Sequence, residues 1–136
     1  MPQQHRCTVW IPLVLAIALA CSACTRTDQK LEQQRDDLKS LVASTAAIAD
    51  AWLAGSTSGT FTATALEQLF LLLGKQRQAL AAAPNRLLDQ RAAELSQAAE
   101  ALARLLAALI HDVRAADGRA VREHLSKLRT IGPGSR

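Results

Sequence analysis

Apolar residues recur at helical spacing along most of this chain, in segments separated by residues that break helices. The first segment runs from about Asp28 to Ala54 and is closed by the loop formers of residues 55–59. Its apolar stripe follows a 4,3,4,3 spacing and consists of Leu38, Val42, Thr45, Ala49 and Trp52, widened by Leu41 and Ile48. This spacing predicts an amphipathic helix with Trp52 packed in the core.

A second helix is predicted to begin between Thr62 and Thr64 and to end before Pro84. Thr64 and Glu67 stand three apart, as in a capping box, and Phe61 is placed to staple onto Leu66. The predicted core stripe is Leu66, Leu69, Phe70, Leu73 and Leu80. A glycine inside the segment, Gly74, indicates close approach of a neighbouring helix or a slight bend.

The third segment, from about Arg86 to Ala116, has the most regular pattern, with Asn85 as its expected N-cap and Asp117-Gly118 as its break. Its 4,3 repeat is typical of a helical bundle seam and comprises Leu88, Ala92, Leu95, Ala99, Leu102, Leu106, Leu109, Val113 and Ala116. A fourth, shorter helix is predicted from about Arg119 to Thr130. Its stripe is Val121, Leu125 and Leu128.

Four amphipathic helices with short connections predict an all-α fold, an up-down antiparallel helical bundle of three to four helices over residues 30–132, with a disordered tail at 133–136. The composition agrees, because 136 residues with 49% hydrophobic and 3% aromatic residues and no Tyr disfavour a β-sandwich or a disordered chain. A short fourth helix is not expected to cover the whole apolar seam of the long third helix. Self-association through that seam, which would make a homo-oligomer, therefore stays an open alternative.

The amino-terminal residues have the layout of an export signal. Arg6 precedes an uncharged apolar run from Val9 to Ala20, and small residues follow. The run of about 12 residues is shorter than the roughly 20 that a transmembrane helix requires. Residues 1–20 are therefore predicted to be a cleaved signal peptide, although an uncleaved membrane anchor stays open.

Two overlapping motifs at the end of this run, Ala18-Leu19-Ala20-Cys21 and Cys21-Ser22-Ala23-Cys24, resemble the signal-cleavage motif of bacterial lipoproteins. The resemblance covers only the first two dozen residues. It departs from the usual pattern at Ala18 and Leu19 in the first motif and at Cys21 in the second. It implies that the Cys21 thiol, or alternatively that of Cys24, receives a lipid, and that residues 21–29 tether the domain to a membrane.

The same resemblance implies an address in the cell envelope. Ser22 or Thr25, and not Asp, follows the candidate cysteine, which favours the outer over the inner membrane, with the domain facing the periplasm. Ala18-Leu19-Ala20 also fits an ordinary A-x-A cleavage site, which would release a soluble secreted helical protein.

No residue constellation predicts catalysis, a cofactor or a metal. Cys21 and Cys24 form a CxxC pair without further ligands, and Cys7 leaves with the signal. His111 is predicted to face solvent and His124 to lie at the edge of its stripe. No E-x-x-H pair, nucleophile elbow or phosphate loop is present. The chain is accordingly not expected to be an enzyme.

Positively charged residues are concentrated towards the carboxyl terminus. Removal of the signal peptide, which contains Arg6, lowers the formal net charge only from +4 to +3. Export excludes nucleic acid, so the basic helix face is either solvated or meets anionic lipid or an acidic partner. The sequence therefore predicts a lipid-anchored, non-catalytic helical interaction or accessory subunit with a protein partner. A periplasmic bundle that binds a small ligand or metal is the alternative.

Overall fold

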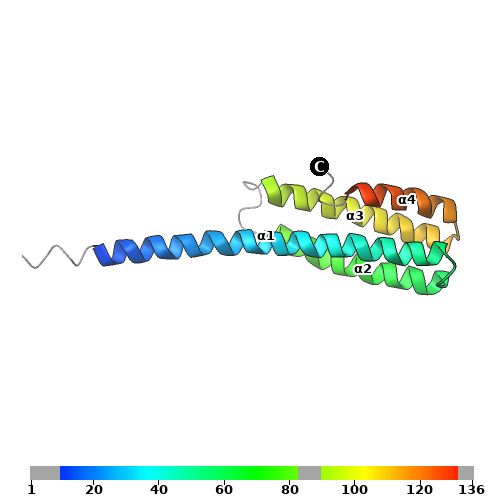
Figure 1. The fold of residues 1–136 in the computed structure, drawn as a ribbon, viewed down its shortest axis with the longest axis horizontal. Coiled ribbons are helices and arrows are strands. Elements are labelled where there is room, and N and C mark those ends of the chain that lie inside the picture. The colour runs from blue at the N-terminus through cyan, green and yellow to red at the C-terminus, as the bar shows by residue number, and fades with distance from the viewer. Residues whose placement is uncertain (1–9, 83–89, 132–136) are drawn as a thin grey trace, which may run out of the picture. The chain divides into compact units, whose positions relative to one another are not determined.

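A computed structural model describes the backbone of residues 10–82 and 90–131, and the side chains from residue 28 onwards within these ranges. These residues form four α-helices and no strand: α1 (Trp10–Leu53), α2 (Gly59–Ala81), α3 (Gln90–Arg114) and α4 (Gly118–Ile131) (Figure 1). The predicted all-α class is thus confirmed. The predictions for Cys7, Pro84, Asn85, Leu88 and the tail at 133–136 lie outside the described residues.

The chain divides into two compact units, Met1–Gln33 and Gln34–Arg136. In the first unit the backbone is helical from Trp10 onwards, so the helix begins well before the predicted Asp28 and includes the expected tether, residues 21–29. Pro12 is compatible with this start because the first-turn N–H groups of a helix have no intrahelical acceptor. Leu and Ala, which dominate the apolar run, are strong helix formers.

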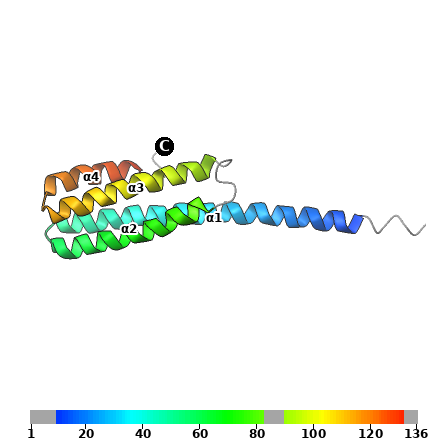
Figure 2. The same cartoon turned by 180° about the vertical axis from the view of Figure 1, so that it is seen from behind.

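In the second unit the helices form an up-down antiparallel bundle (Figures 1 and 2). Helix α3 packs against both α2 and α4. The last part of α1 lies beside α2, where Gln76 Nε2 donates to Asp37 Oδ2 at 2.9 Å. It also lies beside α4, where Arg129 Nη2 donates to Asp50 Oδ2 at 3.0 Å. The order around the bundle is therefore α1, α2, α3, α4 and back to α1.

The core of this bundle is built mainly from leucine and alanine. Helix α3 buries its whole described seam: Ala92, Leu95, Ala99, Leu102, Leu106, Leu109 and Val113. Helix α4 buries Val121, Leu125 and Leu128, as predicted. On α1, Thr45 is completely buried, and its hydroxyl donates to the Leu41 carbonyl oxygen at 2.7 Å, which satisfies the polar group. Trp52, predicted to be in the core, is only half-buried.

Helices α1 and α3 end in the same way. After α1, Gly55 takes a φ of +73°, its N–H donates to the Trp52 carbonyl, and the Ser56 N–H donates to the Ala51 carbonyl. This pattern is a Schellman motif. After α3, the residue in the left-handed conformation is Ala116, with a φ of +53°, where glycine is usual. The predicted seam position of Ala116 is therefore wrong, because this residue closes the helix and is exposed.

Asp117 lies in the break between α3 and α4, as predicted, and it has a second role there. Asp117 is the N-cap of α4: its Oδ1 accepts from the Arg119 and Ala120 N–H groups at 3.1 and 3.0 Å. Gly118 is the first residue of α4. Ala116 and Asp117 thus end one helix and start the next without a longer loop.

The predicted start of α2 is wrong by several residues. Ser58 is the N-cap, and its Oγ accepts from the Phe61 N–H at 3.3 Å. Thr62 is buried with its hydroxyl 2.9 Å from that of Thr57, and the Thr64 hydroxyl donates to the Thr60 carbonyl, so neither threonine caps the helix. Because Ser58 precedes both threonines, the first turn forms before the predicted capping box. Phe61 is 63% exposed, so it does not staple onto Leu66.

The core stripe of α2 is narrower than predicted. Leu66, Leu73 and Leu80 are buried, whereas Leu69 is half-buried and Phe70 is 37% exposed. No atom outside the helix backbone lies within 4 Å of a Cβ placed on Gly74, so close approach of another helix does not explain this glycine. Helix α2 is the element whose apolar residues the bundle covers least.

Candidate functional site

The predicted lipid-attachment residues, Cys21 and Cys24, lie in the first unit, within α1. The structure describes their backbone as helical, and their side chains lie outside what it describes. Over the residues that were described, no helix is long and apolar enough to cross a membrane.

Polar side chains bridge each of the four borders between neighbouring helices of the bundle. Besides the two contacts of α1 given above, Arg77 on α2 pairs with Glu100 on α3, and Arg114 on α3 pairs with Glu67 on α2. His124 on α4 pairs with Asp112 on α3. The side chains of both arginine pairs are more than a third exposed, so each pair contributes little stability in water. Their positions show which helices are neighbours.

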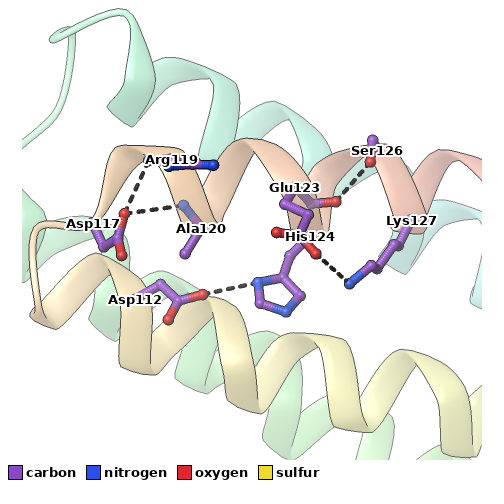
Figure 3. A network of polar contacts seen from close by, with 8 residues as sticks. All are labelled: Asp112, Asp117, Arg119, Ala120, Glu123, His124, Ser126 and Lys127. Carbon is purple, nitrogen blue, oxygen red and sulfur yellow. Dashed lines mark hydrogen bonds and ion pairs between the residues drawn. The ribbon is translucent and has the colours of Figure 1, made fainter.

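The contact between His124 and Asp112 is the most shielded of these (Figure 3). His124 Nδ1 lies 2.8 Å from Asp112 Oδ2, and the side chains are 24% and 13% exposed. Neither atom makes a straight hydrogen bond with any described group, so the contact is a close polar pair and not an aligned hydrogen bond. The predicted boundary position of His124 is confirmed, and His111 is exposed as predicted.

The sequence contained a signal for this pair that periodicity alone does not reveal. Asp112 and His124 directly precede the buried Val113 and Leu125, and both lie six residues from Gly118, at the turn between the two helices. In an antiparallel helix pair, residues at equal distance from the turn meet across the border. A histidine and a carboxylate at matched positions are therefore expected to face each other.

Around this pair, α4 has further polar contacts on its exposed side. Lys127 Nζ donates to Glu123 Oε1 at 2.7 Å, which confirms that predicted i,i+4 pair. The hydrogen bond from Lys127, and then its charge, hold the pKa of the Glu123 carboxyl below its usual value. The charges of His124 and Arg119 act in the same direction, and desolvation acts against them. Ser126 donates to the Glu123 carbonyl oxygen at 2.7 Å.

The arrangement offers limited chemistry. His124 with Asp112 is a base held beside a carboxylate, which is part of many nucleophilic sites but needs a nucleophile within reach. In the part of the chain that the structure describes, no three His, Cys, Asp or Glu side chains come together in a way that could hold a metal ion. A structural role at the α3–α4 border accounts for the pair.

A double-mutant cycle tests this structural role. We expect Asp112→Ala and His124→Ala each to lower the free energy of unfolding, because each leaves the other shielded polar atom without a partner. The double variant should lose less than the sum of the two, with a coupling of about 0.5–2 kcal/mol in urea titrations. The same cycle on the exposed pair Glu123 and Lys127 should give a clearly smaller coupling, because water screens both charges. Additive losses at Asp112 and His124 would contradict the role.

A cavity of about 450 Å³ lies at the end of the bundle where α1 ends and α2 begins. It opens to solvent and is lined by Trp52, Gly59, Thr60, Ala63, Thr64, Val113, Arg114 and Ala116. Its volume is in the range of ligand sites. Its charged group, Arg114, already pairs with Glu67, and the Thr64 hydroxyl is bonded within α2. Two of the polar groups that line the cavity are therefore already paired within the bundle.

The most unusual surface is on the outside of α2. Phe61, Leu71 and Leu72 are 63%, 60% and 48% exposed. We call these three residues the α2 ridge. The sequence placed the uncovered apolar surface on the third helix, whose seam is in fact buried in the bundle. The candidate interaction surface is therefore on α2.

Comparisons with models of protein families, with curated protein sequences and with solved structures found no match to this chain.

Proposed function

We propose that this chain is a lipid-anchored protein of the bacterial cell envelope that acts through contacts with other proteins and not through catalysis. One sequence feature carries the proposal: the run from Val9 to Ala20 leads into Ala18-Leu19-Ala20-Cys21. An exported chain with this ending is expected to be cleaved before Cys21 and to keep a lipid on its thiol. Two or more acyl chains hold a protein stably at a membrane.

Two surfaces of the bundle support a role in protein contact. The α2 ridge leaves three large apolar side chains in water, which is the usual property of an interaction surface. Helix α4 exposes a series of basic residues: Arg119, Arg122, Lys127 and Arg129. This second surface suits an acidic protein or anionic lipid headgroups. The proposed address is the periplasmic face of a membrane, with the outer membrane favoured.

Metabolic labelling with palmitate tests the anchor. We expect the wild-type chain and Cys24→Ser to take up label, and Cys21→Ser to take up none while keeping residues 1–20. Cys24→Ser is the matched control, since it removes an equivalent thiol three residues away. The mass of the mature chain and its amino-terminal residue should place cleavage before Cys21.

Label that persists in Cys21→Ser but disappears in Cys24→Ser would move the anchor to the second cysteine. An unlabelled wild-type chain that begins at Met1 would contradict the proposal. For protein contact, the acylated chain should recover the same protein repeatedly when it is isolated from solubilised envelopes. Failure to recover any would count against an accessory role.

A further inference from the structure

Helix α2 has exposed apolar residues outside its core stripe. Leu66, Leu73 and Leu80 point into the bundle, while the α2 ridge of Phe61, Leu71 and Leu72 is exposed. Exposed polar residues also lie on this outer part of α2, namely Thr64, Gln68 and Lys75. Large apolar side chains left in water are typical of a surface that a partner covers. The bundle covers one side of α2, so the other side lacks a partner within this chain's described residues.

Beside the ridge, α1 presents small side chains. Asp37, Ser40, Ser44, Ala47 and Ala51 follow a 3,4,3,4 spacing and share one face of α1. Gln76 on α2 donates to Asp37, so this face runs along the border with α2. Ser40 and Ala47 are exposed, and Ser44 and Ala51 are half-buried. We call Ser40, Ser44, Ala47 and Ala51 the α1 shelf.

The side of the bundle formed by the ridge and the shelf is nearly free of charge. Between Lys39 and Asp50, α1 has no charged residue. From Gly59 to Gly74, α2 has only Glu67, which pairs with Arg114 on α3 and so faces away from α1. Among the exposed charges of α3 and α4, Arg114 is paired with Glu67 at the border with α2, and Arg129 is paired with Asp50 at the border with α1.

We propose that a second copy of this chain covers this side, with the α2 ridge of each copy packed on the α1 shelf of the other. Large side chains on α2 and small ones on α1 lie next to each other on one surface. A two-fold axis parallel to the helices brings each ridge onto the other shelf, which makes the surface self-complementary. Large side chains opposite small ones are what close helix packing requires.

The register follows from the contacts inside one copy. Gln76 and Asp37 lie at the same height in the antiparallel α1–α2 pair, so Phe61 lies at the height of Ala51 and Leu72 near that of Ser40. With the axis parallel to the helices, these heights are kept between copies. Phe61 therefore packs near Ala47 and Ala51 of the other copy.

The distribution of charge favours a second copy of the chain over a lipid surface as the partner that covers this side. Helices that lie in a membrane interface carry Lys and Arg around their apolar face. The exposed polar residues of α2 next to the α2 ridge are Thr60, Thr64, Gln68 and Gln78, and the one exposed cation of α2 is Lys75. Two copies bring no like charges together at the ridge or the shelf. This dimer names the partner of the α2 ridge and so rests on the protein-contact part of the proposed function, but it does not require the lipid anchor, so loss of the anchor leaves it unaffected.

The test uses the full chain in a mild non-ionic detergent and measures its mass by sedimentation equilibrium. We expect a reversible dimer, with a dissociation constant in the micromolar range, because one helix pair per copy covers less than the roughly 800 Å² per partner of a standard interface. Leu72→Glu on the ridge and Ala47→Arg on the shelf should each raise the dissociation constant at least about tenfold. Ala107→Glu, on the exposed side of α3, is the matched control and should leave it unchanged.

Both ridge and shelf positions are solvent-accessible in the single chain, so the variants should keep the wild-type circular dichroism. A photo-crosslinking phenylalanine derivative at Phe61 gives a second, independent measurement. The expected product has twice the chain mass and joins position 61 to residues 47–51 of another copy. A wild-type chain that is monomeric at several hundred micromolar would overturn the proposal. So would equal effects of Leu72→Glu and Ala107→Glu, or crosslinks only to lipid or to a different protein.

Discussion

Leu102→Asp is expected to unfold the bundle. Leu102 lies in the middle of α3 and is completely buried among the seam residues of that helix. The substitution removes apolar contacts and places a carboxylate where no cation or water is available. Such a change exceeds about 4 kcal/mol, which is close to the whole stability of a domain of this size, about 5–15 kcal/mol. Circular dichroism of the full chain should show most of the helical signal lost at 25 °C.

The matched control is Arg104→Ala, two residues further along the same helix. Arg104 is exposed, and alanine is a better helix former than arginine. We expect the free energy of unfolding, measured by urea titration, to stay within about 0.5 kcal/mol of the wild-type value. Similar losses in both variants would contradict the burial of the α3 seam.

Leu128→Ala is expected to release α4 from the bundle. Helix α4 has 14 residues, which is marginal for an isolated helix in water, so it depends on docking. Leu128 is completely buried, and its truncation should cost about 2–5 kcal/mol through lost contacts and the cavity that remains. Amide hydrogen exchange should show the largest loss of protection over residues 118–131.

Lys127→Ala is the control for this variant because it changes the neighbouring, exposed residue. It removes the bond from Lys127 to Glu123, which contributes little stability because both side chains are exposed to water. Amide protection in α4 should therefore stay close to that of the wild-type chain. Equal loss of protection in both variants would mean that α4 is not held by its leucines.

Prediction from sequence succeeded best for α3 and α4. Their apolar residues recur at strict spacing on one face with polar residues elsewhere, so a single rotation of each helix buries all of them. Helix α2 was predicted less well. Its run Leu69–Leu73 is apolar in every direction, so periodicity cannot tell which leucines face the core. The position of α2 between α1 and α3 decides it, and Leu71 and Leu72 remain outside.

Helix ends show the same limit on a smaller scale. Ser58 and Thr62 are both acceptable N-caps by residue type, and the choice depends on which hydroxyl the tertiary structure needs elsewhere. Thr62 is buried against Thr57, so Ser58 caps α2. Likewise, α4 starts at Gly118 and Asp117 is its N-cap. The chain therefore reverses direction at Ala116, which adopts the left-handed conformation.

The sequence by itself determined the all-α class and the apolar stripes of α3 and α4 that are buried, because these depend on local spacing. Only the tertiary structure decided which helices are neighbours, that Asp112 meets His124, and that the uncovered apolar surface is on α2. The physical reason is that an apolar stripe shows which face of a helix must be buried, but not against which other helix. That choice depends on the packing of all four helices together.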